Sequence, residues 1–258
     1  MGERSKVLVL GGTGKAGICL LRELLYRNHE TIAYARNPSK IPEDVASNPL
    51  LSVIQGEITD NQALSSAISQ CHMIVSLLGP VTIRMTDPAQ YANFYKESIF
   101  PLMREHSVKR IYAMGTISIR RPEDSFSFVR WLIRLLMMTI AMTVYKNVLA
   151  IEKVFETEAT DLEWLVYRIA GIPGETDEAS WRVDREEGKT FVGWVGEKGW
   201  QASQKRAALT RWLVDAVEGG AEEWIGKMPA TPDVVTGARR PVDLVLITAD
   251  AENSGDVS

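Results

Sequence analysis

Residues 6–17 read Lys6-Val-Leu-Val-Leu10 followed by Gly11-Gly-Thr-Gly14-Lys-Ala-Gly17, and this stretch decides the fold. The apolar residues after Lys6 predict a buried strand, the glycines predict a tight turn, and the apolar-patterned run 18–27 predicts a helix. A strand, a G-x-G-x-x-G turn and a helix in this order are typical of a dinucleotide site, because the N–H groups and the positive dipole end of the helix attract the pyrophosphate. The alternative is a tight strand-to-helix turn that binds nothing.

The end of the second expected strand, 31–35, indicates which dinucleotide is bound. Chains that bind NAD usually carry Asp or Glu there, and this acid hydrogen-bonds the ribose 2′-hydroxyl. This chain has Arg36, with Lys40 four residues on. A guanidinium suits a 2′-phosphate, so we predict NADP(H) rather than NAD. An ordinary solvated arginine at a strand end is the alternative.

Length and composition bound the class of protein. With 258 residues, of which 45% are hydrophobic and 24% charged, the chain is long enough for one large α/β domain. A net charge of −4 without a cluster of Lys and Arg argues against nucleic acid as a partner. Cys19 and Cys71 lie in apolar runs outside any C-x-x-C pair, which is typical of reduced core residues of a cytoplasmic protein. The three histidines lack metal-ligand spacing, so we expect no metal site.

One apolar stretch, 126–144, is a candidate membrane segment. Arg130 and Arg134 interrupt it and leave only 135–144 uncharged, which is too short to span a bilayer. The apolar start of the chain is the first expected strand and lacks a cleavage site, so no signal peptide is expected. We therefore expect a largely buried helix over the apolar stretch, with a hydrophobic ligand nearby as a further hypothesis.

Strands and helices alternate along most of the chain. Further strands are expected at 51–54, 73–78, 110–114 and 162–168, and further helices at 61–70, 89–106, 127–157 and 207–217. Thr59 or Asp60 can cap the helix that starts at residue 61. The alternation predicts a doubly wound parallel sheet, α/β in class, with ligands bound beyond the carboxyl ends of the strands. The loops at those ends are 11–17, 36–40, 55–60, 78–86, 115–122 and 169–205.

The carboxyl-terminal portion differs in composition. We expect residues 1–170 to form the nucleotide-binding core, 171–248 to form a small substrate cap on the same domain, and 249–258 to be a disordered tail. Residues 191–195 are expected to form a short strand. Trp181, Trp194 and Trp200 are candidates for the wall of a substrate pocket, with plain core packing as the equally weighted alternative.

Five stretches carry a resemblance to a known family. They are Gly11-Gly-Thr-Gly-Lys-Ala-Gly17, Ala35-Arg-Asn-Pro-Ser-Lys40, Gln55-Gly-Glu-Ile-Thr-Asp60, residues 108–115 and residues 161–168. Together they resemble the atypical short-chain dehydrogenase/reductase superfamily, and within it the NmrA-like or NAD(P)-binding group. The sequence also resembles members of this group from fungal secondary-metabolite pathways. The resemblance covers residues 5–172 and is loose beyond them, apart from 204–213.

The resemblance implies a Rossmann-type fold that binds NADP(H), and it assigns roles to individual residues. Arg36 and Lys40 would hold the 2′-phosphate, and the stretch from Glu57 through Ile58 to Thr59 would border the adenine. Leu78 and Gly79, after the fourth strand, are further expected cofactor contacts. The implied pyrophosphate contacts are Gly11, Thr13, Gly14, Lys15, Ala16 and Gly17.

The catalytic motif of the redox members is absent. Those members carry Tyr-x-x-x-Lys on the helix after the fifth strand, where the lysine lowers the pKa of the tyrosine and the phenol passes a proton to a carbonyl. No lysine of this chain has a tyrosine four residues earlier. Tyr145 and Lys146 are adjacent, so they point about 100° apart on a helix. The sixth strand also departs from the family, with Arg168-Ile169 where Arg-Pro is usual.

Other side chains are candidates for the chemistry. Tyr145 and Lys146 remain catalytic candidates, with an amphipathic core tyrosine as the alternative. Thr116 and Ser118 follow the fifth strand, where a hydroxyl often orients the substrate, and the alternative is a loop hydroxyl that caps a backbone N–H. An acidic run that opens the expected cap could supply a general acid, although solvated surface is its more usual role. Its members are Glu175, Asp177 and Glu178.

Three functions fit these patterns. The first is an NADP(H)-dependent reductase of a hydrophobic small molecule, a biosynthetic tailoring enzyme with a non-standard proton donor. The second is a non-redox isomerase or cyclase on the same fold. The third is an NmrA-like regulatory protein that senses NADP and binds a protein partner. We favour an enzyme over a sensor, and a homodimer is a further hypothesis.

Overall fold

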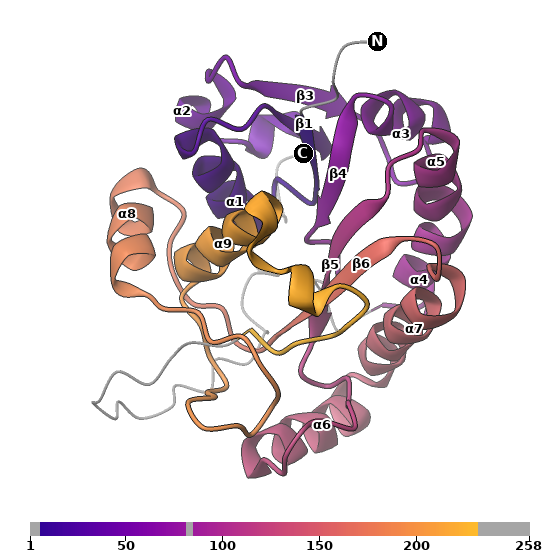
Figure 1. The fold of residues 1–258 in the computed structure, drawn as a ribbon, viewed down its shortest axis with the longest axis vertical. Helices are drawn as coiled ribbons and strands as arrows, with labels where there is room; N and C mark the ends of the chain where they lie inside the picture. The colour runs from indigo at the N-terminus through magenta and orange to yellow at the C-terminus, as the bar shows by residue number, and fades with distance from the viewer. Residues whose placement is uncertain (1–5, 81–84, 232–258) are drawn as a thin grey trace, which may run out of the picture.

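The computed structural model describes residues 6–80 and 85–231. Six parallel strands form one sheet in the order β3-β2-β1-β4-β5-β6 (Figure 1). The chain starts at the centre of the sheet, runs to one edge and then returns to build the other half, so the strand order reverses between β1 and β4. This is the Rossmann-type arrangement that the alternation predicts. The strands are β1 Lys6–Leu10, β2 Thr31–Ala35, β3 Leu51–Gln55, β4 Cys71–Ser76, β5 Arg110–Thr116 and β6 Glu163–Ile169.

Apolar side chains on both faces explain why this sheet is covered by helices on both sides. Side chains alternate along each strand, so Leu8 packs in one apolar cluster and Val9 in the other. One face carries α1 Lys15–Tyr26, α2 Glu43–Ala46 and α9 Arg206–Asp215. The other face carries α3 Asn61–Ile68, α4 Gln90–Phe94, α5 Phe100–Glu105 and α7 Met142–Glu158. The two further α-helices of the described residues are α6 Phe128–Ile140 and α8 Glu178–Glu187.

The helix expected at 89–106 forms with an irregular turn inside it. A π-helical turn, Tyr95–Ile99, separates α4 from α5. Pro101 lies two residues after this turn and has no N–H to donate to it, which accounts for the wider helix there. Asp60 is one of the two residues that were expected to cap the helix α3. It does so through its Oδ1, which accepts the Ala63 N–H over 2.9 Å.

The prediction of one continuous helix over residues 127–157 is wrong. Two helices, α6 and α7, meet at Ala141 with 117° between them. Ala141 is non-helical, with φ −132° and ψ 45°. The Thr139 hydroxyl donates to the carbonyls of Leu135 and Leu136, each over 3.0 Å, and hydroxyl bonds of this kind to a helix backbone favour bending at its end.

The expectation that residues 126–144 form a largely buried helix is also wrong. The buried side chain of α6 is Arg130, whereas the apolar side chains Phe128, Trp131 and Leu135 are exposed. An apolar run predicts burial only where a second surface covers it, and the bend turns α6 away from the sheet. No single helix in residues 6–80 and 85–231 is long and apolar enough to cross a membrane, although the bent pair α6 and α7 passes that test together by length and composition.

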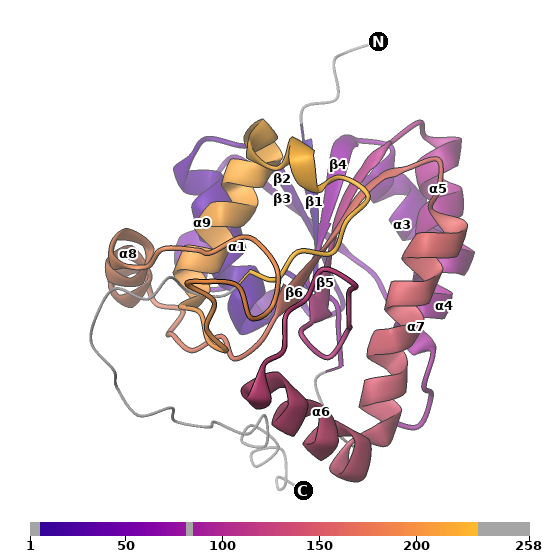
Figure 2. The ribbon, with the colours of Figure 1, turned by 60° about the horizontal axis from the view of Figure 1, so that its bottom comes forward.

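The short strand expected at 191–195 does not form. Gly193 makes one isolated bridge with Ala230, and the chain then turns at Gly196, whose φ is +83°. The Glu197 carboxylate accepts the Trp194 N–H over 2.9 Å, which closes that turn. The helix α9 forms where it was expected and packs beside α1 (Figure 2). The expected tail, 249–258, and residues 232–248 of the expected cap lie outside the described residues.

Candidate functional site

The glycine loop after β1 excludes side chains at two points. Gly11 has φ +84°, which favours glycine. A Cβ atom on Gly17 would lie 2.2 Å from the Gly11 carbonyl oxygen and 2.6 Å from the Gly12 Cα. The third glycine of the motif therefore lets α1 approach the loop closely. Gly14 differs, because a Cβ atom there would meet only the Gly11 oxygen, at 3.6 Å.

The amino-terminal end of α1 has the properties of an anion site. Gly14 is the N-cap residue, no side chain caps the helix, and its first turn contains no acid. The helix begins at Lys15 and is 12 residues long, so its dipole favours negative charge near Gly14. A closely packed glycine loop next to an uncapped helix start fits the pyrophosphate that the resemblance implies at Gly11 and at residues 13–17.

The loops after β2 and β3 lie side by side at the same edge. The Gln55 side chain donates to the Arg36 carbonyl over 3.3 Å, and the side chain of Arg36 is exposed. Lys40 is also exposed, at the end of the short helix Pro38–Lys40. Burial raises the pKa of Tyr91 in α4, and the cation of Arg36 opposes that rise, which places Arg36 near the start of α4. Both predicted 2′-phosphate contacts, Arg36 and Lys40, are therefore exposed to solvent.

A tyrosine under the loop after β3 fixes its course. The Tyr34 hydroxyl donates to the Glu57 carbonyl over 2.8 Å, and a Cβ atom on Gly56 would lie 2.1 Å from the same hydroxyl oxygen. Burial raises the pKa of Tyr34 to about 12, so this hydroxyl remains a donor over the physiological range. Ile58 packs against the apolar cluster beneath, and the exposed Glu57 stays at the edge.

The segment after β4 contacts the glycine loop. The Leu77 N–H donates to the Leu10 carbonyl over 2.9 Å, and a Cβ atom on Gly11 would lie 3.2 Å from the Leu77 carbonyl carbon. A Cβ atom on Gly79 would lie 2.8 Å from the Met114 Cε of β5. The structure therefore brings Gly79 and its neighbour Leu78 to the edge that carries the glycine loop. Residues 81–84 of this expected loop lie outside the described residues.

The two hydroxyl candidates after β5 differ in exposure. Thr116 is partly exposed, and its hydroxyl accepts the Ser118 N–H over 3.3 Å. Thr116 thus has the contact that its alternative interpretation describes, a loop hydroxyl that caps a backbone N–H. Ser118 is 2% exposed.

Tyr145 has a cationic partner that the sequence did not suggest. Arg134 of α6 donates from Nη2 to the Tyr145 hydroxyl over 2.9 Å, and its guanidinium carbon lies 5.9 Å from the centre of the ring. Tyr145 is 8% exposed and Lys146 is exposed. The available signal was a charged residue inside an apolar run, since Arg130 and Arg134 are the charged residues of 126–144.

Asn147, two residues after Tyr145, joins α7 to the chain that follows β4. It is fully buried, and its Nδ2 donates to the Asp87 carbonyl over 3.1 Å. Its Oδ1 is buried and has no partner among the described residues. The first turns of α7 therefore carry a buried polar group beside the Tyr145 contact.

A buried ion cluster holds α6 to the end of β6. Asp124 accepts from Arg168 at both carboxylate oxygens, each over 2.8 Å, and from Arg130 over 2.6 Å. The Val195 N–H donates to the same carboxylate over 3.1 Å. Burial would raise the pKa of Asp124, but the hydrogen bonds and charge of Arg168 outweigh it and lower that pKa. Arg168, which precedes the isoleucine that stands in place of the family's usual proline, thus anchors the start of α6.

The three tryptophans of the expected cap do not gather in one place. Trp181 is 2% exposed and packs with Cys19 and Ala207 between α8, α1 and α9, which is the core interpretation. Trp200 packs instead beside Ile117, Val195 and Ala230. Trp194 meets Trp224 edge to face, with 5.5 Å between ring centres.

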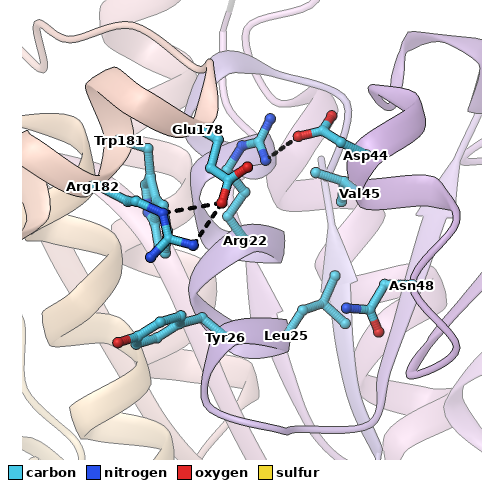
Figure 3. Close-up of a pocket in the computed structure, with 9 residues that line it drawn as sticks. All are labelled: Arg22, Leu25, Tyr26, Asp44, Val45, Asn48, Glu178, Trp181 and Arg182. Carbon is cyan, nitrogen blue, oxygen red and sulfur yellow. Dashed lines mark hydrogen bonds and ion pairs between the residues drawn. The ribbon is translucent and has the colours of Figure 1, made fainter.

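A surface depression beside Trp181 lies on the outer side of α1 (Figure 3). Figure 3 shows Arg22 reaching Asp44, and Arg182 reaching Glu178 on the same helix, α8. The cations of this depression are therefore already paired, and it shares no residue with the glycine loop. The nine residues that line it are Arg22, Leu25, Tyr26, Asp44, Val45, Asn48, Glu178, Trp181 and Arg182.

Comparison with known proteins identifies relatives over part of the chain. Pinoresinol reductase 2 of Arabidopsis thaliana is 33% identical over 91 residues, which are 32% of this chain and 28% of that protein. A 3-beta-hydroxysteroid dehydrogenase of Mycolicibacterium neoaurum is 32% identical over 87 residues, which are 31% of this chain and 23% of that protein. The chain thus spans about a quarter to a third of the length of the curated relatives it matches.

Solved structures share the whole fold at low identity. A short-chain dehydrogenase/reductase from Veillonella parvula in complex with NADP has a TM-score of 0.65 and 13% identity, covering 88% of this chain and 94% of that chain. The family described as NAD(P)H-binding matches residues 11–218, from the glycine loop to the end of α9 and beyond. The chain therefore belongs to the NAD(P)H-binding family.

Proposed function

We propose that the protein is an NADP(H)-dependent reductase of a hydrophobic small molecule, with Tyr145 as its proton donor. The observation that carries this proposal is the hydrogen bond from Arg134 to the Tyr145 hydroxyl, 2.9 Å long. It supplies a cation to the phenol in a chain that lacks the usual lysine. The names of the matched relatives, among them reductases and a dehydrogenase, agree with the reaction class.

The cofactor part of the proposal rests on the glycine loop and Arg36. Gly14 and Gly17 would leave room for the pyrophosphate at the start of α1, and the exposed Arg36 and Lys40 would bind the 2′-phosphate. NADPH, when bound, supplies a hydride equivalent. A preference for NADP(H) over NAD(H) follows from the two cations, since the residue after β2 is not an acid.

The catalytic part gives Tyr145 and Arg134 separate roles. As a carbonyl carbon of the substrate accepts a hydride, its oxygen accepts the Tyr145 proton, and an alcohol results. The Arg134 cation, fixed on the phenol oxygen, compensates the negative charge that remains there until water returns the proton. Arg134 touches the proton donor and not the substrate, so it is a positioning residue.

The substrate class is inferred from the composition of α6 and of the start of α7, the two segments that meet at the Arg134–Tyr145 hydrogen bond. Their side chains are mostly apolar, and they include Leu136, Met137 and Val144. This composition favours an apolar substrate that presents a single polar group to Tyr145. A biosynthetic role is a prediction that rests on the resemblance of the sequence alone.

The test is steady NADPH oxidation, followed at the nicotinamide absorption band, with a panel of apolar aldehydes, ketones and enones. We expect turnover with at least one of them and a loss of about a hundredfold or more in kcat for Tyr145→Phe. The matched control is Tyr26→Phe, which removes the hydroxyl of an exposed tyrosine in α1 and should leave kcat within about twofold. Turnover of a substrate with no change at the nicotinamide band would instead favour the isomerase or cyclase hypothesis.

A further inference from the structure

In residues 6–80 and 85–231, most of the exposed large apolar side chains lie on α6 or within two residues of its ends. Among the described residues, eleven large hydrophobic side chains are exposed, and eight of them lie between residues 126 and 142. Single exposed apolar residues are ordinary, but a contiguous group of this size marks an interaction surface. We name this group the α6 apolar surface. It consists of Phe126, Phe128, Trp131, Leu132, Leu135, Met138, Ile140 and Met142.

Polar contacts hold α6 near both of its ends, and Ile133 packs between them against the cluster of Ile117, Val195 and Ala230. The buried side chain of α6, Arg130, binds Asp124 over 2.6 Å, and Ser127 accepts the Arg130 N–H over 3.3 Å at the start of the helix. Arg134 binds Tyr145 near the other end. Because these bonds fix the helix, most of its apolar side chains are left out of the protein core. Figure 2 shows α6 at the end of the molecule beyond β5 and β6, where it forms the outermost helix.

The charged side chains within residues 125–151 are all basic. Residues 125–151 contain Arg130, Arg134 and Lys146 but no Asp or Glu, in a chain with 33 acidic residues. Arg134 has a phenol and not a carboxylate as its hydrogen-bond partner, and Lys146 is exposed. Near the amino-terminal end of α6, the exposed acids Glu123 and Glu197 are equal in number to two exposed cations close to them in the sequence. Those cations are the exposed Arg120 and Lys198.

We propose that the α6 apolar surface docks on the surface of a lipid bilayer that contains anionic lipids. A helix with Trp, Phe and Leu side chains, basic residues and no acid has the composition of helices that lie in the headgroup region. Phe128 and Trp131 stack with 5.6 Å between their ring centres, and such aromatic side chains favour the membrane interface. Lipid phosphates would also attract the exposed cation of Lys146.

The charge pattern argues against a second copy of the chain as the occupant. A symmetric dimer through α6 would place two helices without acids face to face, with Arg134 and Lys146 on both sides. No carboxylate from 125–151 would lie between them. Anionic headgroups would complement the cations of this region, whereas a second copy of the chain would bring the same cations and repel them. The docking does not depend on the reaction proposed above.

Sedimentation of the full chain with vesicles tests the proposal. The vesicles are phosphatidylcholine alone and phosphatidylcholine with phosphatidylserine. We expect binding that is tighter with phosphatidylserine and weaker at high salt. The double variant Trp131→Ser/Leu135→Ser removes two apolar side chains of one helix face and should weaken binding about tenfold or more.

The matched control is the double variant Val53→Ser/Val183→Ser, which removes two exposed apolar side chains outside α6 and should bind vesicles like the wild type. The proposal is overturned by absence of vesicle binding, or by an equal loss in both double variants. A third result also overturns it. The wild type would bind no vesicles and be a dimer by light scattering, and Trp131→Ser/Leu135→Ser would convert this dimer to a monomer. NADPH titration of the same variants separates this proposal from the reductase proposal, because the α6 variant should bind NADPH unchanged.

Discussion

Arg134 donates a hydrogen bond to the Tyr145 hydroxyl over 2.9 Å across the 117° bend between α6 and α7. The two residues are eleven positions apart, so a continuous helix would keep their side chains about three turns from each other. The bend at Ala141 is what lets them meet. In the Tyr-x-x-x-Lys arrangement, the tyrosine and the lysine lie on the same helix. Here the cation that contacts the phenol comes from a neighbouring helix, α6.

Replacement of Arg134 separates catalysis from binding. We expect Arg134→Met to lower kcat about tenfold to a hundredfold, because the phenol oxygen loses the cation that compensates its charge. NADPH affinity should stay within about twofold, since the glycine loop is untouched. Arg134→Lys should restore part of kcat by returning a cation, which a purely structural role for Arg134 would not predict. An unchanged kcat in Arg134→Met would exclude the positioning role.

Arg36 decides the choice between the two nicotinamide cofactors. We expect Arg36→Ala to weaken NADPH binding roughly tenfold to a hundredfold, the usual size of a lost charge-assisted contact to phosphate, and to leave NADH binding nearly unchanged. Calorimetric titration of both cofactors measures the ratio. The control is Arg182→Ala, which removes an exposed cation from α8. Equal weakening of NADPH and NADH by Arg36→Ala would show that this arginine does not contact the 2′-phosphate.

Two glycines of the loop should respond differently to alanine. Gly17→Ala places a Cβ atom 2.2 Å from the Gly11 oxygen, so the backbone must shift, and the free energy of unfolding should fall by roughly 1–3 kcal/mol. Gly14→Ala meets only one atom, at 3.6 Å, and should change stability by less than about 1 kcal/mol while weakening NADPH binding. Urea unfolding and NADPH titration of both variants check this. Similar stabilities of the two variants would contradict the packing described for α1.

Asp124 should be a determinant of stability and of its pH dependence. Asp124→Ala leaves the fully buried Arg168 without its carboxylate, which should cost about 3–5 kcal/mol of unfolding free energy. The pKa of Asp124 is lowered in the folded state. Its contribution is therefore fully present above the unfolded-state pKa of about 4 and is lost as pH falls through the lower folded-state value.

Thermal unfolding between acid and neutral pH measures that contribution. The wild type should lose stability below about pH 4 more steeply than Asp124→Ala does. The exposed Asp161, which pairs with Arg104, provides the comparison, and Asp161→Asn should have the smaller effect because surface ion pairs contribute little. If Asp124→Ala and Asp161→Asn were equally stable, the buried cluster would not anchor α6.

Local patterns were sufficient to predict most of the fold. The glycine loop, Arg36 and the Asp60 cap follow from residues close in sequence, and alternating strands and helices predict a parallel sheet by general rules. The break at Ala141 could not be predicted in the same way, because no Pro or Gly marks it and the Thr139 hydroxyl bonds appear only in the folded helix.

Long-range contacts account for what the sequence did not reveal at the candidate site. An apolar run looks the same whether the core covers it or not, so the exposure of Trp131 and its neighbours had no sequence signal. The meeting of Arg134 with Tyr145 depends on the bend, and the meeting of Asp124 with Arg168 joins residues 44 positions apart. The sequence predicted that the Thr116 hydroxyl lies at the end of β5. It left open whether that hydroxyl contacts a substrate or caps a backbone N–H.

Calorimetric titration of the full chain with NADPH, with NADH in parallel, tests the central claim most directly. The account predicts saturable binding of NADPH at one site per chain, with NADH bound at least about tenfold more weakly because it lacks the 2′-phosphate. If the chain binds neither cofactor, the glycine loop is a tight turn without a ligand and the reductase account is wrong. If NADH binds as tightly as NADPH, the role given to Arg36 is contradicted.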